Sequence, residues 1–322
     1  MIHKKIKNII FIIFCFLIIY ICFDLIKKLD LSKITGNFVL SYETYFLIAF
    51  LCLLHELINI IQNITLYKCL QNNFSKTQFI FIYYSSYFSK YMMFFKLGTP
   101  IRFALLKTLL GIRIRNSISI KMVLVFFSLC STIITGLVGL YFSEVIGEQY
   151  SGQSLAILSA SLFLIILLFL FVNQFLPKAY KGNIWILTKI FDLIFDLTKR
   201  LKKFPMKVIG FISIGMVIRS IILSSISFLI ITQISNISIS FFTILAISAI
   251  GNLASLLSIL PMGIGPKDLS LIYLFSLIGV EKEHVLIMLL YDRIIWIFIP
   301  LAFGAISFLY LKFKKLIIFK KS

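Results

Sequence analysis

Acidic residues are scarce in this chain: 12 Asp and Glu stand against 32 Lys and Arg, leaving a formal net charge of +20. Residues 57–143 contain no acidic side chain. Long polar stretches are lacking too, because 60% of the residues are hydrophobic and the mean hydropathy is +1.04. A soluble domain needs a polar exterior, which this composition cannot supply. We therefore expect one integral membrane domain over residues 1–322, without an appended soluble enzyme.

Motifs of several other protein classes are also missing. The five cysteines show no CxxC or Cys/His spacing, so they predict neither a disulfide nor a metal site. His55 and Glu56 begin an HExxH-like sequence, but Asn59 stands where the second histidine ligand would be. The chain contains no DxD cluster and no ATP-binding motif. We expect no metal and no cofactor, and we favour a transporter that works downhill or by coupling to ions or protons over an enzyme.

The basic residues cluster at the ends of apolar runs. This placement favours contact with anionic lipid headgroups over nucleic-acid binding, which we do not expect. By the positive-inside bias, the basic segment around Arg113 and Arg115, residues 178–207 and the C-terminal tail are cytoplasmic. The N- and C-termini are then both cytoplasmic. Abundant Ile, Phe, Lys and Asn indicate an AT-rich microbial genome, and we expect a multi-pass protein of the plasma (inner) membrane.

The apolar runs predict an all-α, polytopic membrane protein with about eight spans, since ~20 residues cross a hydrocarbon core of ~30 Å. The predicted spans are residues 8–25, 45–66, 78–95, 118–142, 155–176, 208–232, 241–260 and 285–311. Two further apolar pieces, residues 100–112 and 266–279, are too short to cross alone at 1.5 Å per residue. Residues 183–204 have a helical period with one charged face, which predicts an interfacial amphipathic helix on the cytoplasmic leaflet.

Proline and glycine interrupt the apolar sequence at residues 98–100 and 261–266. Two prolines and two glycines within residues 261–266 cannot continue a helix. Broken backbone at membrane depth survives only where protein or a water-filled cavity satisfies its polar groups, and transporters place substrate sites there. Each half of the chain would then contain a span, a break, a short re-entrant helix and another span. Two explanations of this repeated pattern stay open: an inverted repeat, or a coincidence in a chain rich in Phe and Ile.

A few ionisable residues lie inside predicted spans, where each charge costs ~2.5–3.5 kcal/mol and needs a partner or a function. They are Glu56, Arg219, Asp292 and Arg293. Arginine can grip a phosphate in two places, so one interpretation is recognition of an anionic headgroup. The other is an internal ion pair, such as Arg219 with Asp292 or Glu56. Glu56 also shares a helix face with Asn59 and Asn63, and interhelical hydrogen bonding is the structural alternative for that stripe.

The last third of the chain resembles the lysylphosphatidylglycerol synthase transmembrane region, also called the flippase-like family. The matching residues are 261–268 (Pro-Met-Gly-Ile-Gly-Pro-Lys-Asp), 277–280 (Leu-Ile-Gly-Val), Arg293, Pro300 and Gly304. A weaker block at residues 100–111 is similar to the family's P-x-R segment. The chain departs from the pattern with Asp268 where Glu is usual, and without the acyltransferase domain of the aminoacyl-lipid synthases. The resemblance thus implies the lipid-handling membrane half.

Two hypotheses of different classes follow. In the first, a flippase-like protein moves an anionic phospholipid or glycolipid between leaflets. The headgroup would bind in a cavity formed by Arg102, Arg219, Arg293, Gly263 and Gly265. The coupling or ion-pair acids would be Glu56, Asp268 and Asp292. In the second, the chain is a membrane enzyme or accessory subunit in lipid-linked sugar synthesis, with Asp268 and Asp292 as metal-binding or general-base groups. A scaffold for a partner synthase or glycosyltransferase, and assembly into a homo-oligomer, also stay open.

Overall fold

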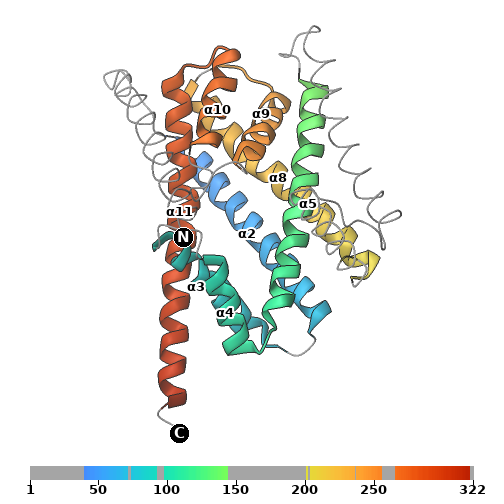
Figure 1. The fold of residues 1–322 in the computed structure, drawn as a ribbon. Coiled ribbons are helices and arrows are strands. Elements are labelled where there is room, and N and C mark those ends of the chain that lie inside the picture. The colour runs from blue at the N-terminus through green and yellow to red at the C-terminus, as the bar shows by residue number, and fades with distance from the viewer. Residues whose placement is uncertain are drawn as a thin grey trace, which may run out of the picture.

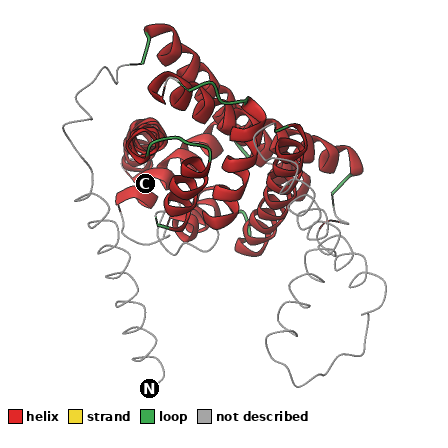
Figure 2. Ribbon diagram, turned by 90° about the horizontal axis from the view of Figure 1, so that it is seen from above, coloured by secondary structure: helices red, strands yellow, loops and turns green. Residues whose placement is uncertain are grey.

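The computed structural model describes residues 40–71, 74–92, 98–143, 201, 204–235, 237–255 and 265–319. These residues form eight helices and no strand. Figure 2 shows the helices from above. The prediction of an all-α fold is therefore confirmed for the described part of the chain. The predicted spans at residues 8–25 and 155–176 lie outside it. So does most of the predicted interfacial helix at residues 183–204, of which Leu201 and Phe204 are buried against the core.

The two halves of the chain present the same order of helix lengths. The first contains α2 (Tyr42–Leu70), α3 (Lys76–Met92), α4 (Gly98–Leu110) and α5 (Ile114–Phe142). The second contains α8 (Met206–Ser235), α9 (Phe241–Ala254), α10 (Pro266–Leu277) and α11 (Lys282–Phe319). In each half a long helix is followed by two short helices and another long one. Figure 1 shows the two short pairs at opposite ends of the molecule, α9 and α10 at the top and α3 and α4 lower down.

Three of the described helices, α2, α5 and α8, are long and apolar enough to cross a membrane by length and composition. By contrast, α9 and α10 contain 14 and 12 residues. At 1.5 Å per residue they reach only about 21 and 18 Å, short of a ~30 Å hydrocarbon core. The second pair of short helices therefore cannot consist of two complete spans.

Two helix boundaries differ from the sequence prediction. The helix expected over residues 241–260 ends at Ala254, and Ser255 caps it. The break expected at residues 98–100 is wrong in position, because Gly98 is the first residue of α4. Proline is tolerated in the first turn of a helix, where its missing N–H has no intrahelical partner to lose, so Pro100 does not interrupt α4.

The halves pack on each other through matching pairs of helices. At one end of α2, the backbone N–H of Ser41 donates to Gln233 Oε1 near the end of α8 (3.2 Å). Farther along α2, Gln62 Nε2 donates to the carbonyl oxygen of Ile212 near the start of α8 (2.9 Å). These contacts show that α2 and α8 run antiparallel. The most extensive of the other contacts also join the two halves, because α3 packs on α11 and α5 packs on α9.

The apolar core consists of two clusters on either side of a polar section. One cluster joins the first part of α2 to the second part of α8 and to α9, α10 and α11, with Cys52, Ile226 and Phe275 fully buried. The other joins the second part of α2 to α3, α4, α5 and the first part of α8, with Leu66, Phe79 and Ile212 buried. Between them, α2 and α8 present polar side chains, which places the candidate site at mid-length of both helices.

The backbones of the two halves approach each other closely where α5 meets α9. A Cβ atom on Gly139 would lie 2.5 Å from the backbone nitrogen of Ala246 and 2.8 Å from the carbonyl oxygen of Phe242. Backbone atoms cannot move aside as a flexible side chain can. Gly139 is therefore required for the present separation of the two helices.

We predict that Gly139→Ala lowers the free energy of unfolding by roughly 1–3 kcal/mol, the usual effect of overpacking. Gly210→Ala is the matched control, because a Cβ at this helical position meets nothing within 4 Å. Denaturant unfolding in mild detergent measures both. Equal stability of the two variants would contradict the close contact between α5 and α9.

Candidate functional site

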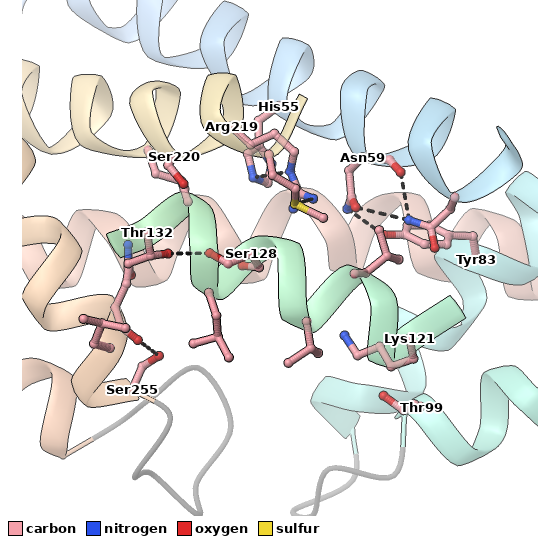
Figure 3. Close-up of a pocket in the computed structure, with 18 of the residues that line it drawn as sticks. His55, Asn59, Tyr83, Thr99, Lys121, Ser128, Thr132, Arg219, Ser220 and Ser255 are labelled. Carbon is pink, nitrogen blue, oxygen red and sulfur yellow. Dashed lines mark hydrogen bonds between the residues drawn. The ribbon is translucent and has the colours of Figure 1, made fainter. Parts of the chain in front are cut away.

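A cavity of about 540 Å³ opens between the two apolar clusters. Side chains from α2, α3, α4, α5, α8 and α9 line it, as Figure 3 shows in close-up. Its polar lining residues are His55, Asn59, Asn63, Tyr83, Thr99, Arg102, Lys121, Ser128, Thr132, Arg219, Ser220, Asn252 and Ser255. Both halves of the chain contribute, so the cavity exists only when they are packed together.

The charged residues that line the cavity are all basic. Arg102 of α4, Lys121 of α5 and Arg219 of α8 line it, and no Asp or Glu appears among the described lining residues. A cluster of cations beside apolar helices favours occupation by an anion, because a charge that is partly removed from water gains most from a counter-charge. The arrangement can thus bind a negatively charged group without any metal. In the described ranges no cluster of three or more His, Cys, Asp or Glu side chains could hold a metal ion.

Arg219 is held by neutral groups. Its Nε donates to His55 Nε2 on α2 (3.2 Å), and one terminal nitrogen donates to Gln62 Oε1 (3.4 Å). The same terminal nitrogen lies 3.6 Å from the Met216 sulfur. Among the described residues no carboxylate lies within ion-pair distance of Arg219, so neither Glu56 nor Asp292 neutralises it. Figure 3 shows Arg219 and His55 meeting between α8 and α2.

Arg102 enters the cavity from the short helix α4. Its Nε donates to Ser86 Oγ on α3 (2.8 Å), and its guanidinium carbon lies 4.1 Å from the centroid of the Tyr83 ring. A cation over an aromatic face is stabilised without being neutralised. The Tyr83 hydroxyl in turn accepts from Asn59 Nδ2 of α2 (2.6 Å). These contacts orient the Arg102 guanidinium, which lines the cavity.

The polar residues of α2 lie in two different environments. Asn59 and Asn63 line the cavity together with His55, whereas Gln62 faces α8 and Glu56 does not line the cavity. Interhelical hydrogen bonding is confirmed for Asn59 and Gln62, which bond to Tyr83 and Ile212. Glu56 is nevertheless buried, with 7% of its surface exposed.

Four charged residues at the start of α10 and on α11 form two crossed ion pairs. Lys267 Nζ lies 3.1 Å from Asp292 Oδ2, and Arg293 donates to Asp268 Oδ1. The charges on neighbouring residues are reversed between the two helices, so the group is neutral overall. Asp268 and Asp292 are thus each paired with a cation. Arg293 is not among the residues that line the cavity.

The glycine break contributes to the structure through Gly265. This residue has a φ of +95°, a backbone conformation that residues with a side chain rarely adopt, and it begins α10. Its N–H donates to Asp268 Oδ2 (3.2 Å), which satisfies one of the free donors at the helix start. Gly263 lies outside the described residues. Asn252, Leu253 and Ser255, at the end of α9, line the cavity.

Sequence reasoning missed several lining residues. Lys121 was taken as one of many basic residues at a span end, although it points toward the same cavity as Thr99 in Figure 3. The comparison with the HExxH motif gave His55 no binding role, and Tyr83 was not singled out. The helical period of α2 could have placed His55 beside Asn59 and Asn63, because these positions are four residues apart. No sequence signal distinguishes Tyr83 from the other tyrosines.

A comparison with models of known protein families identifies the family of this chain. The model of the lysylphosphatidylglycerol synthase TM region matches residues 8–304. The chain belongs to this family. It is therefore a membrane protein, and the family indicates a role in lipid or cell-envelope biology. No curated protein matches the chain, and no solved structure does. The resemblance found at the glycine break thus extends along nearly the whole of this family member.

The crossed ion pairs yield a prediction about stability. Either Lys267→Asp or Asp292→Lys places like charges together between α10 and α11, and we expect each to lower the free energy of unfolding by roughly 2 kcal/mol. The double variant exchanges the two charges and should recover more than half of the summed loss. Denaturant unfolding of the four proteins in detergent measures the coupling. Strictly additive losses would show that the pair contributes nothing.

Proposed function

We propose that the protein moves an anionic phospholipid or glycolipid between the two leaflets of the membrane. The observation that carries this proposal is the cavity lined by Arg102, Lys121 and Arg219 with no acidic residue among the described lining residues. Family membership supports a lipid substrate. The headgroup would bind these three cations while the acyl chains stay in the surrounding lipid.

The rest of the lining suits a headgroup that carries hydroxyl groups as well as a phosphate. Ser128, Thr132, Ser220 and Ser255 line the cavity, and Asn252 adds an amide. Hydroxyl and amide side chains can each donate and accept hydrogen bonds, as a glycerol or sugar headgroup requires. Arginine is suited to the phosphate, because its planar fork can hold two oxygens at once.

The arrangement of the two halves supports alternating access. Both halves have the same order of long and short helices, and their first helices, α2 and α8, run antiparallel. Repeats whose equivalent helices point in opposite directions are inverted with respect to the membrane. The exchanged contacts of α3 with α11 and of α5 with α9 are those expected from a two-fold relation. We propose that the halves rock about the cavity between them, as in other inverted-repeat transporters.

Location and partners complete the proposal. The positive-inside bias places both termini in the cytoplasm of a microbe, with the protein in its plasma membrane. The crossed ion pairs suggest a role for Arg293, Asp268 and Asp292 in fixing α10 against α11. Glu56 is the remaining buried acid for ion or proton coupling. A partner synthase or glycosyltransferase, or a second copy of the chain, stays a prediction from the sequence.

Replacement of the cavity cations tests the proposal. In vesicles that contain the purified protein, we expect Arg219→Gln and Lys121→Gln each to slow leaflet exchange of a fluorescent phosphatidylglycerol at least about tenfold, since each removes a charge-assisted contact. Lys121 is exposed, so its variant should fold even if Arg219→Gln does not. Arg113→Gln is the control, because Arg113 is exposed in the connector before α5 and does not line the cavity.

The same vesicles separate the alternative functions. Exchange at the wild-type rate in both cavity variants would remove the cations from the mechanism. Formation of a new lipid when a sugar-carrying lipid donor is added, without exchange in its absence, would favour the membrane enzyme. Neither exchange nor product would leave the scaffold as the remaining hypothesis.

A further inference from the structure

The contact between His55 and Arg219 fixes the protonation state of the histidine. The Nε–H group of arginine is always a donor, so His55 Nε2 must accept at the observed 3.2 Å. The imidazole is therefore neutral and carries its proton on Nδ1. Arg219 thus occupies the one lone pair through which His55 could take up a second proton.

The other side of the imidazole is poorly satisfied. His55 Nδ1 lies 3.5 Å from Glu56 Oε1, too far for a good hydrogen bond. Among the described residues, neither His55 Nδ1 nor Glu56 Oε2 has a hydrogen-bond partner. Both side chains are buried, with 5% and 7% of their surfaces exposed. A buried carboxylate beside a neutral imidazole gains a charged partner if that imidazole becomes a cation.

We propose that His55 is a proton-binding site coupled to the anion in the cavity. An anion that binds the Arg219 guanidinium competes with His55 for its donors and draws Arg219 away from Nε2. One proton from water then binds to Nε2, and the resulting imidazolium lies between the anion and Glu56. No bond of the ligand is broken. This inference rests on the proposed function, because it uses the same cavity and the same class of anion.

The surrounding charges give the coupling its sign. Arg219 of α8, Lys121 of α5 and Arg102 of α4 face the cavity, Glu56 adjoins His55 on α2, and α11 presents the edge of Trp296, 4.8 Å from the His55 ring. Asp292 of α11 is paired with Lys267. Without a bound anion, the adjacent Arg219 guanidinium opposes a positive charge on His55, and a bound anion compensates for that guanidinium. Anion binding therefore favours proton uptake, and by linkage the proton strengthens anion binding to the same extent.

Calorimetric titration of the full-length protein in mild detergent tests this coupling. The probe is dihexanoyl-phosphatidylglycerol, whose phosphodiester does not itself titrate between pH 5 and 8. Repeating the titration in buffers of different ionisation enthalpy gives the number of protons taken up. We expect close to one proton per bound lipid at a pH above the titration of free His55, and affinity that falls by up to about tenfold per pH unit there.

Two further ligands identify the source of the anion. The deacylated headgroup, glycerophosphoglycerol, carries the same phosphodiester without acyl chains, and dihexanoyl-phosphatidylcholine carries a compensating cation. Proton uptake with the headgroup alone would support the coupling and indicate that a soluble phosphodiester suffices. Equal uptake with the phosphatidylcholine would overturn it, because a zwitterion adds no net negative charge to the cavity.

His55→Gln is the decisive variant, because glutamine can accept from Arg219 and donate to Glu56 but does not titrate. It should still bind the probe, with no proton uptake and with affinity independent of pH. His284→Gln is the control, since His284 does not line the cavity, and it should keep the wild-type uptake. Binding without uptake in the wild-type protein, or unchanged uptake in His55→Gln, would overturn the inference and leave the proposed function intact. Absence of binding at every pH would instead remove the proposed function, and the inference with it.

Discussion

The structure depends on holding the Arg219 guanidinium between apolar helices through neutral contacts. Arg219 is bonded to an imidazole, an amide and a thioether, none of which carries a negative charge. These contacts fix where the guanidinium points, and they leave its attraction for an anion largely intact. A carboxylate in place of one of these groups would cancel that attraction. Arg102 enters the same cavity over an aromatic ring and donates to a hydroxyl.

Other charged residues of the same protein are neutralised by ion pairs. Lys267, Asp268, Asp292 and Arg293 neutralise one another across α10 and α11, close to Gly265, which caps the start of α10. Crossed pairs fix the rotation of one helix against the other, because both must form at once. This member of the lysylphosphatidylglycerol synthase TM region family thus combines a charge-neutral contact between α10 and α11 with a cavity lined by cations.

Much of the fold could be predicted from the sequence, because hydrophobic length and the placement of proline and glycine are local properties. The short helices after both breaks were expected within a few residues of where α4 and α10 occur. The end of α9 and the start of α4 were not, since helix boundaries depend on capping contacts and on neighbours. Ser240 accepts from the Thr243 N–H at the start of α9 (3.3 Å), whereas no comparable side-chain signal marks its end.

The sequence by itself determined the class of the protein, the helical pattern, the excess of basic charge and the residues that break the second half. It singled out Arg102, Arg219 and Arg293 as equal candidates, because each is an arginine within or beside an apolar run. Only the tertiary structure decided that Arg102 and Arg219 share a cavity with Lys121, while Arg293 pairs with Asp268. The physical reason is that a side chain's charge is compensated by what lies near it in space. The groups that face Arg219 come from α2, more than a hundred residues away in the chain.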